Sequence, residues 1–324
     1  MIKFGVMGAG RISASFSSAV NGINEHLYAI ASRNLLKAET FKNKYHYQVA
    51  YGSYEEMLDD PLVDCVYIAT PHSFHFDQMK LCLEKGKHIL CEKSFTLNHK
   101  QAIIIYELAR RKHLFVMEAM WTRFLPTLLE VKKLIDQDEI GEIIQIDATF
   151  GFKAEMDLQN RLFNLNLGGG ALLDVGLYTL TLANLFLGVP DNIESTVVMS
   201  KEGIDLSETI TYFYPHAQAV LMASLVEDLG TDAYIYGTKG YFHIPSFHSA
   251  NLAILYNNNH KALREIEHKH IVNGLEYEIF ETIKCIKKKS IESPLMTHEN
   301  SIEILRQMDH LRKKWNLVYP QELG

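Results

Sequence analysis

The sequence predicts an α/β fold: a doubly wound parallel sheet, followed by an α+β domain with a large, open, mostly antiparallel sheet flanked by helices. Two observations predict it. Up to about Trp121, short apolar strands alternate with helical patterns through short connections, which is typical of a parallel sheet. After that point the strands lengthen and alternate polar with apolar residues, as in a sheet with one buried face.

The first 121 residues contain six short apolar segments that we expect to form the parallel sheet. These strands are Ile2–Met7, Leu27–Ser32, Val49–Tyr51, Asp64–Ala69, His88–Cys91 and Leu114–Met117. Helical patterns lie between them, after the first strand and at Leu36–Tyr45, Tyr54–Leu58, Phe74–Glu84 and Asn98–Arg111. Because crossovers between parallel strands are right-handed, the loops that follow the strands should lie along one edge. We expect one domain over residues 1–121 and a second over 122–324.

The second domain begins with an amphipathic helix at Thr127–Asp136. Its expected strands are Ile143–Gly151, Glu194–Ser200, Glu208–Tyr214, Gln218–Val226, Ala233–Gly237 and Leu252–Tyr256. Further helices are expected at Gly170–Leu187, Leu275–Lys288 and Asn300–Trp315. A single sheet with helices on one face leaves apolar residues wet on the other. We therefore expect a homodimer or a higher homo-oligomer.

Composition narrows the class of protein. The chain has 324 residues, 47% hydrophobic and 22% charged, with a net charge of −7, which is typical of a globular protein of two domains. We find no basic stripe for nucleic acid and no apolar run of membrane-spanning length, and we expect no leader segment. The four cysteines lack CxxC spacing, and no His/Cys cluster indicates a metal. We expect a cytoplasmic protein without nucleic-acid, membrane or metal partners.

A glycine turn follows the first strand and precedes a helical pattern. It reads Gly8-Ala9-Gly10-Arg11-Ile12-Ser13, in which a serine takes the third small position. In a Rossmann domain the first glycine permits a tight turn, the second admits a pyrophosphate, and the helix N-terminus offers free N–H groups. An ordinary glycine turn remains the alternative, because the motif is short and imperfect. Its place after an N-terminal strand favours a dinucleotide site.

The end of the second strand selects the cofactor. NAD sites usually carry an acidic residue there that binds the ribose 2′-OH, whereas this chain has Ser32-Arg33-Asn34. An arginine at this place can pair with the 2′-phosphate of NADP and stack on adenine. We therefore favour NADP over NAD, although NAD is possible if Arg33 only stacks on the adenine.

Three further residues combine a titratable group with a suggestive place in the chain. Lys93 follows a buried strand at the sheet edge where cofactor and substrate meet, and Glu92 could orient it. Asp174 and Tyr178 are four positions apart after Gly168-Gly169-Gly170, so in a helix they share one face. The alternatives are a surface lysine and a helix cap followed by a core tyrosine.

Several strings of this chain resemble the Gfo/Idh/MocA oxidoreductase family, and within it the dimeric dihydrodiol dehydrogenase-like branch. The most specific strings are Met117–Phe124, MEAMWTRF, and Gly168–Tyr178, GGGALLDVGLY. Further matching strings include Gly8–Ile12, Ala31–Arg33, Tyr51–Glu55, Ile68–Pro71 with His75, Gly86–His88, Cys91–Lys93, Gly237–Gly240 and Glu276–Glu278. The family's Glu-Lys-Pro reads Glu92-Lys93-Ser94 here, which loses a rigid turn.

The resemblance implies reversible NADP-dependent oxidation of a secondary alcohol on a sugar, polyol or cyclic diol. It implies catalytic roles for Lys93, Tyr178 and Asp174, with Tyr178 as general acid/base and the Lys93 cation favouring its phenolate. The implied cofactor-binding residues are Gly8, Gly10, Arg11, Ile12, Ser32, Arg33, Thr70, Pro71, His75, Glu92 and Lys93. The residues expected to line the substrate pocket are Trp121, Phe152, Arg161 and Asp174, with His75 as a further candidate.

The alternative function is that of a non-catalytic NADP-binding sensor or regulatory protein of the same fold. A sensor need not keep both Lys93 and Tyr178, so their presence favours the enzyme. We expect these two residues to meet beside the nicotinamide C4, where a proton must join or leave the substrate oxygen.

Overall fold

The computed structural model describes residues 1–323, which form two compact units. The first unit comprises Met1–Trp121 together with His270–Ile302. The second comprises Thr122–Lys269 and the residues from Glu303 onward. Residues 270–302, which the sequence analysis placed in the second domain, thus pack with the first unit.

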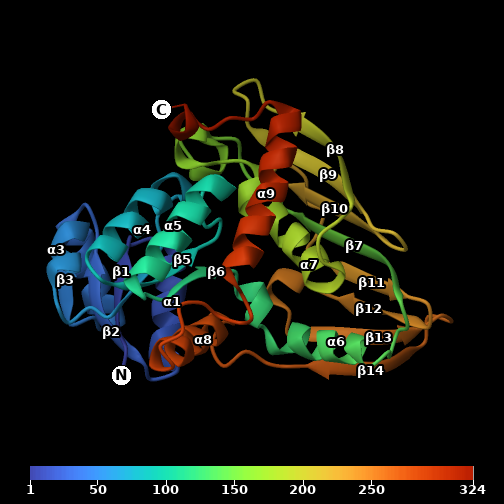
Figure 1. The fold of residues 1–324 in the computed structure, drawn as a ribbon, viewed down its shortest axis with the longest axis horizontal. Coiled ribbons are helices and arrows are strands. Elements are labelled where there is room, and N and C mark those ends of the chain that lie inside the picture. The colour runs from blue at the N-terminus through green and yellow to red at the C-terminus, as the bar shows by residue number, and fades with distance from the viewer. Residues whose placement is uncertain (324) are drawn as a thin grey trace. The chain divides into compact units, whose positions relative to one another are not determined.

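The first unit is built on a six-stranded parallel sheet, as predicted. Its strands are β1 (Lys3–Met7), β2 (His26–Ala31), β3 (Val49–Tyr51), β4 (Cys65–Ile68), β5 (His88–Glu92) and β6 (Val116–Ala119). The strand order is β3-β2-β1-β4-β5-β6, and every pair is parallel (Figure 1). This order brings β1 and β4 side by side at the middle of the sheet, where the strand order reverses and where such sheets bind dinucleotides.

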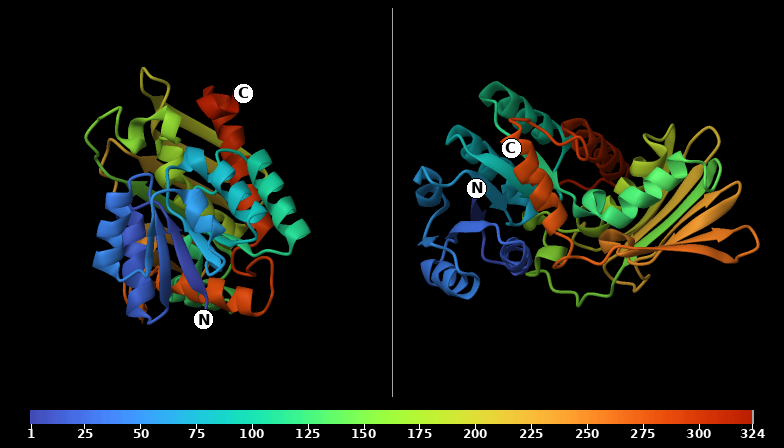
Figure 2. Two further views of the ribbon diagram at one scale, coloured as in Figure 1. Left: turned by 90° about the vertical axis from the view of Figure 1, so that its left-hand side faces the viewer. Right: turned by 90° about the horizontal axis from the view of Figure 1, so that it is seen from below.

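Helices cover both faces of this sheet. They are α1 (Arg11–Gly22), α2 (Leu35–Tyr45), α3 (Tyr54–Asp59), α4 (His75–Glu84), α5 (His99–Lys112) and α8 (Glu276–Lys287). The helices α4 and α5 pack together on one face, and α1 packs with α2 and α8 on the other (Figure 2). Asn34, Ser53 and Asn98 each cap the helix that follows, because their side-chain oxygens accept a hydrogen bond from a backbone N–H of its first turn.

The segment before α8 explains why this late part of the chain joins the first unit. The carboxylate of Glu276 accepts hydrogen bonds from four successive backbone N–H groups, those of residues 271–274, at 2.8–3.1 Å. These bonds favour the ionised form and lower the pKa of Glu276, although burial opposes them. The Asn273 side chain then donates to the Ser15 carbonyl of α1 at 2.9 Å. Such long-range docking leaves no periodic signal in the sequence.

The second unit contains an eight-stranded sheet of order β14-β13-β12-β11-β7-β10-β9-β8. Its strands are β7 (Ile143–Gly151), β8 (Asn192–Met199), β9 (Asp205–Phe213), β10 (Gln218–Ser224), β11 (Ala233–Gly237), β12 (Gly240–Ile244), β13 (Leu252–Asn257) and β14 (Ala262–Glu267). All neighbours are antiparallel except β7 and β10, which pair in parallel. The predicted mostly antiparallel sheet is therefore confirmed.

Two strands of this sheet, β12 and β14, were not predicted from the sequence. In β14 only Ile266 is buried, so the strand shows no alternation of polar and apolar residues. In β12 the alternation is present, but tyrosine and histidine occupy the outer positions and obscure it. Strand β12 forms only as the partner of β11 and β13, to which it is hydrogen-bonded on its two sides.

Three helices lie on one face of this sheet: α6 (Pro126–Asp136), α7 (Leu177–Leu187) and the part of α9 (His298–Trp315) after Ile302 (Figure 2). Alternate strand residues such as Ile146, Leu221 and Phe242 are buried on that face. Between Leu165 and Leu187 the chain is apolar enough, at a mean hydropathy of 1.5, to resemble a membrane span, contrary to the sequence expectation. That window is 78% buried inside the protein, as is typical of a core helix.

Candidate active site

The glycine turn between β1 and α1 has the geometry that a dinucleotide site requires. Gly8 has a φ of +97°, and a Cβ there would lie 2.9 Å from the Ala69 carbonyl oxygen. A Cβ at Gly10 would have no neighbour within 4 Å, so the backbone faces open space at that point. The Ser13 hydroxyl donates to the Gly8 carbonyl at 2.7 Å and closes the turn. The third small position therefore supplies a hydrogen bond in addition to close packing.

The first turn of α1, which contains Arg11 and Ile12, carries no acidic side chain. Its unpaired N–H groups and the positive end of the helix dipole would attract a phosphate. The turn and the helix end thus fit a dinucleotide pyrophosphate, with Gly10 as the point of close approach.

The loop after β2 carries a cation and no carboxylate. The Ser32 hydroxyl accepts a hydrogen bond from the Asn34 backbone N–H at 3.3 Å. The exposed Arg33 guanidinium lies 5.7 Å from the centre of the Phe74 ring. Burial raises the pKa of Tyr54, and the charge of nearby Arg33 partly opposes that rise. Arg33 therefore stands among aromatic side chains at the strand end that contacts the adenosine ribose in such folds.

The loops after β4 and β5 are tied together by His75. Its ring nitrogens lie 2.8 Å from the Thr70 carbonyl oxygen and 2.9 Å from the Ser94 carbonyl oxygen. The ring is fully buried, which lowers the pKa of His75. In this structure His75 thus contacts backbone groups that flank Pro71 and Lys93.

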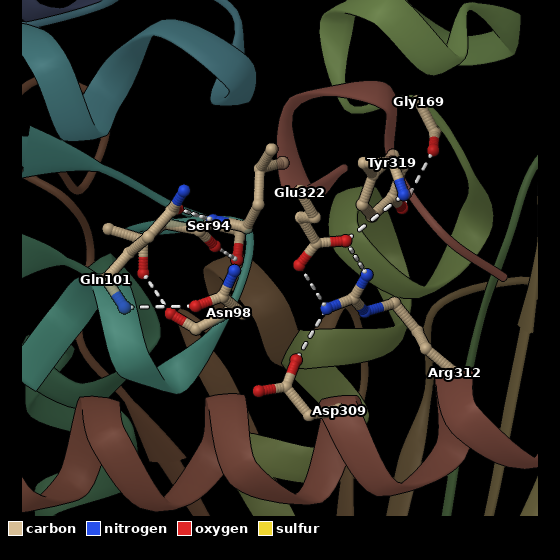
Figure 3. A network of polar contacts seen from close by, with 10 residues as sticks. Ser94, Asn98, Gln101, Gly169, Asp309, Arg312, Tyr319 and Glu322 are labelled. Atoms are coloured by element: carbon tan, nitrogen blue, oxygen red, sulfur yellow. Dashed lines mark hydrogen bonds and ion pairs between the residues drawn. The ribbon is translucent and has the colours of Figure 1, made fainter. Parts of the chain in front are cut away.

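Lys93 is half-buried directly after β5, and its peptide bond to Ser94 is cis. The loop that follows is closed by local hydrogen bonds. The Asn98 side chain accepts from the Gln101 backbone N–H at 3.0 Å, and the Gln101 side chain accepts from the Leu97 N–H at 3.2 Å (Figure 3). The cap at Asn98 and the contact of Ser94 with His75 constrain the segment even though it lacks the family's proline.

Glu92, which immediately precedes Lys93, is buried close to a second acidic residue, Glu278. Glu92 accepts a short hydrogen bond from the Tyr67 hydroxyl, and the Tyr67 ring stacks on Phe16 at 3.7 Å. Glu278 of α8 is fully buried, and neither carboxyl oxygen has a hydrogen-bond partner within residues 1–323. Burial, together with the charges of Glu92 and Glu276, raises the pKa of Glu278 well above its usual range. This shift favours the protonated, uncharged form of Glu278.

In the second unit, the Gly168-Gly169-Gly170 loop opens a π-helical turn, Leu172–Gly176, that continues into α7. Gly170 has a φ of +124°. Asp174 lies in the π turn, and Tyr178 follows at the start of α7. Single π turns within helices occur often at functional sites.

This segment brings several predicted residues together. The Asp174 carboxylate is 8% exposed and accepts a hydrogen bond from the Arg161 Nη1 at 2.9 Å, whereas Arg161 is half exposed. Phe152 packs against a buried cluster that includes Phe163 and Val175. Trp121 belongs to the first unit and is half-buried at the start of a short 3₁₀ turn.

The sequence analysis missed two neighbours of Tyr178. The Phe150 ring centre lies 5.2 Å from that of Tyr178, and the His248 ring centre lies 6.0 Å away. Phe150 occupies the end of β7, where the alternating pattern could have marked it. His248 lies in a short 3₁₀ turn, Phe247–Ser249, that has no sequence signature. Within residues 1–323 no group of three or more His, Cys, Asp or Glu residues could hold a metal ion.

We predict that Glu278→Gln stabilises the protein relative to wild type, and that the gain grows from pH 5 to pH 8. The folded state keeps a proton on Glu278 that an unfolded glutamate loses above about pH 4.3. Wild-type stability therefore falls as pH rises toward the folded-state pKa. Glutamine resembles the neutral acid and does not titrate. Urea unfolding midpoints of both proteins would show it.

The matched control is Glu107→Gln on α5, an exposed position whose difference from wild type should stay constant with pH. A Glu278→Gln difference that is equally independent of pH would contradict a neutral Glu278.

Comparison with known proteins extends these observations over the whole chain. Residues 2–120 match a family described as "Oxidoreductase family, NAD-binding Rossmann fold", and residues 128–243 match the "GFO/IDH/MocA C-terminal domain". The chain is 34% identical over 330 residues to the trans-1,2-dihydrobenzene-1,2-diol dehydrogenase of Xenopus tropicalis, covering 98% of this chain and 99% of that protein. It is 30% identical to the D-xylose 1-dehydrogenase (NADP(+)) of Hypocrea jecorina, covering 99% and 93% respectively.

Solved structures show the same fold. A levoglucosan dehydrogenase in complex with NADH and levoglucosan superposes with a TM-score of 0.87 at 18% identity, covering 97% of both chains. Three observations indicate the same family. They are the glycine turn, the six-stranded parallel sheet and the similarity to these relatives over nearly the full length of the chain. The chain therefore belongs to the Gfo/Idh/MocA family of NAD(P)-dependent oxidoreductases.

Proposed function

We propose that this protein is an NADP-dependent dehydrogenase that reversibly oxidises a secondary alcohol on a sugar, polyol or cyclic diol. The observation that carries the proposal is the π turn that holds Asp174 in an ion pair with Arg161 and leads into Tyr178. Two relatives of nearly equal length, named for a cyclic diol and for xylose, support the substrate class. Both named substrates carry neighbouring hydroxyl groups, so a site for them needs one acid/base group and polar groups for a second hydroxyl.

The first unit would hold the cofactor. Gly8 and Gly10, with the N–H groups of Arg11 and Ile12, suit the pyrophosphate, and Arg33 suits a 2′-phosphate. The NADP(+) in the name of the xylose dehydrogenase agrees with this choice, whereas the NADH in the levoglucosan complex shows that the fold also accepts the other cofactor. When bound, the nicotinamide would accept or give the hydride.

Side chains of the protein would transfer the proton that accompanies the hydride. Removal of hydride from a carbinol carbon leaves a carbonyl only if the hydroxyl proton leaves too, and Tyr178 is proposed to exchange that proton. An isolated phenol has a pKa near 10, so a nearby cation is needed to favour phenolate at neutral pH, and we assign this to Lys93. Asp174, oriented by Arg161, would accept a hydrogen bond from a second substrate hydroxyl. The aromatic rings of Phe150 and Phe152 would pack against the substrate ring.

We predict that wild-type protein binds NADPH more tightly than NADH and that Arg33→Ala removes most of the preference. Loss of a charge-assisted contact to phosphate costs about 1.5–3 kcal/mol, or roughly ten- to a hundredfold in affinity. Titration of each reduced cofactor by fluorescence measures it. Lys37→Ala, which removes an exposed cation from the first turn of α2, should leave both affinities within about twofold. Equal wild-type affinities for the two cofactors would contradict the assignment.

We predict that Tyr178→Phe lowers turnover by about 10²–10⁴, which is the usual contribution of one acid/base group, while NADPH affinity is kept. Lys93→Met should be at least as damaging. Steady-state rates with NADP⁺ and the best polyol of a substrate panel would show both effects. Tyr214→Phe is the control, because the Tyr214 hydroxyl donates to the Gly188 carbonyl, a backbone group outside the proposed site. Normal turnover by Tyr178→Phe would make this tyrosine a packing residue.

We predict that the protein is a homodimer that covers the helix-free face of the eight-stranded sheet. Five rings on β11, β12 and β13 are half-buried and contact one another, along β11 and between neighbouring strands, at centre distances of 4.4–5.9 Å. They belong to Tyr234, Tyr236, Tyr241, His243 and Tyr256. In a monomer these five rings would remain partly exposed to solvent. Light scattering at micromolar concentration should give twice the 37.0 kDa of one chain.

A charge placed among these rings, Tyr241→Glu, should shift the mass toward one chain. Ile104→Glu, an exposed position on α5, should not. A monomeric mass for wild type would remove this part of the proposal.

A further inference from the structure

Two buried acidic residues of β9 lie beneath the turn that carries Asp174. Asp205 and Glu208 are 0% and 3% exposed. In a regular strand, residues three apart would point to opposite faces. Here the pairing of β8 with β9 shifts between Val198 and Met199, and this bulge places both acids on the buried face.

Asp205 contacts the start of the π turn directly. Its Oδ2 accepts a hydrogen bond from the backbone N–H of Leu172 at 2.6 Å. A Cβ at Gly170 would lie 2.0 Å from its Oδ1, so only glycine lets the carboxylate approach this closely. Asp205 therefore caps the turn from a strand more than thirty residues further along the chain.

Glu208 lies against the other end of the same turn. A Cβ at Gly176 would lie 2.6 Å from its Oε1. Neither of its carboxyl oxygens has a hydrogen-bond partner within residues 1–323, and the Oδ1 of Asp205 likewise has none. The two glycines at the ends of the turn are thus each in contact with one buried acid.

Arg312, whose charge acts on Asp205, makes its hydrogen bonds with other residues. Arg312 of α9 donates to Asp309 at 2.6 Å and to both carboxyl oxygens of Glu322 at 2.7 and 3.0 Å (Figure 3). Its guanidinium also lies 5.0 Å from the Tyr319 ring centre. The Tyr319 hydroxyl donates to the Gly169 carbonyl at 3.0 Å, so this C-terminal segment holds the glycine loop while the two acids hold the turn (Figure 3).

Burial is the main cause of raised pKa values in both acids. Burial raises the pKa of Asp205 to about 7, although the N–H of Leu172 and, further down, the charge of Arg312 favour its ionised form. Burial and the charge of Asp205 raise the pKa of Glu208 well above its usual range. The groups that face the pair are the N–H groups of Ala171 and Leu172, Arg312 from α9 and Tyr319 from the C-terminal segment.

We propose that Asp205, with Glu208 as its buried neighbour beneath Gly176, is a positioning residue that fixes the Leu172–Gly176 turn and thereby the placement of Asp174 and Tyr178. This inference rests on the proposed function only for the catalytic meaning of that placement. The mechanical part, that one buried carboxyl group holds the turn, stands without any substrate.

Opening of the turn is expected to depend on pH. Opening of the turn exposes Asp205 to water, where an aspartate ionises near pH 3.9. Between that pH and about 7 the closed turn keeps a proton that the open turn loses. Opening therefore becomes easier as pH rises through this window and levels off above it. Backbone hydrogen exchange of the turn, corrected for intrinsic rates, reports the opening.

The experiment is hydrogen exchange followed by mass spectrometry on the full chain without cofactor, at pH 5, 6, 7 and 8. In wild type, the protection of peptides covering residues 171–178 should fall by about tenfold or more from pH 5 to pH 8. Asp205→Ala removes the acceptor and should speed exchange in this segment at least about tenfold at pH 6. Asp205→Asn keeps an acceptor oxygen without titrating, so it should restore protection and remove the pH dependence.

The control is Glu202→Gln, an exposed acid just before β9, which should leave the segment as in wild type at every pH. If Asp205→Ala does not fold, the comparison of wild type with Asp205→Asn carries the test alone. Protection that is independent of pH in wild type, or the same pH profile in Asp205→Asn, would overturn the proposal. Because no substrate or cofactor takes part, this outcome is separate from that of the proposed reaction.

Discussion

Buried carboxyl groups contribute to both of the segments on which the site depends. A buried carboxylate is costly in free energy unless a group of opposite charge or a hydrogen-bond donor compensates it. When two acidic residues are buried side by side, protonation of one of them is therefore favoured. In the first unit Glu92, which precedes Lys93, is buried close to Glu278, and in the second Asp205 and Glu208 lie beneath the turn of Asp174. Apolar residues of similar size would often stabilise a core at least as well as such polar groups. The proposed contribution of Asp205 is accordingly the position of the turn that it contacts, rather than stability.

The glycines of the second unit follow from the same constraint. Gly170 and Gly176 are needed where side chains of β9 approach the backbone, and the φ of +124° at Gly170 adds a conformational reason. In the first unit, Gly8 is needed because the Ala69 carbonyl approaches, while Gly10 leaves space for a ligand. Glycines that look alike in the sequence are thus needed for different reasons. Some allow neighbouring atoms to pack closely against the backbone, whereas Gly10 leaves the backbone accessible to a ligand.

Much of the fold could be predicted from the sequence because local patterns determine it. The alternation of apolar strands with helices was enough for the parallel sheet, and period-two alternation was enough for most of the second sheet. The parallel pairing of β7 with β10 and the strands β12 and β14 could not be predicted, because neighbours decide them. Residues 270–302 pack with the first unit through long-range contacts such as the hydrogen bond from Asn273 to Ser15, which no periodicity reveals.

The candidate site also contains residues that the sequence predicts and residues that it does not. Arg161 and Asp174 were both named from the sequence, and the structure joins them in an ion pair. Asp205 could not be found from local sequence, because it acts on a residue 33 positions away and reaches it through a bulge. His248 lies 6.0 Å from Tyr178 by ring centres, yet nothing in the surrounding string distinguishes it from a surface histidine. The pairing of Lys93 with Tyr178 stays a prediction.

The most direct test of the account is isotopic. Full-length protein would be incubated with NADP⁺ and, in turn, with pentoses, hexoses, anhydro sugars, inositols and trans-dihydrodiols that carry deuterium at the carbinol carbons. The account predicts that at least one of them yields NADPH heavier by one deuterium, as read by mass spectrometry. NADP⁺ that binds to the protein but gains deuterium from none of these compounds would contradict it.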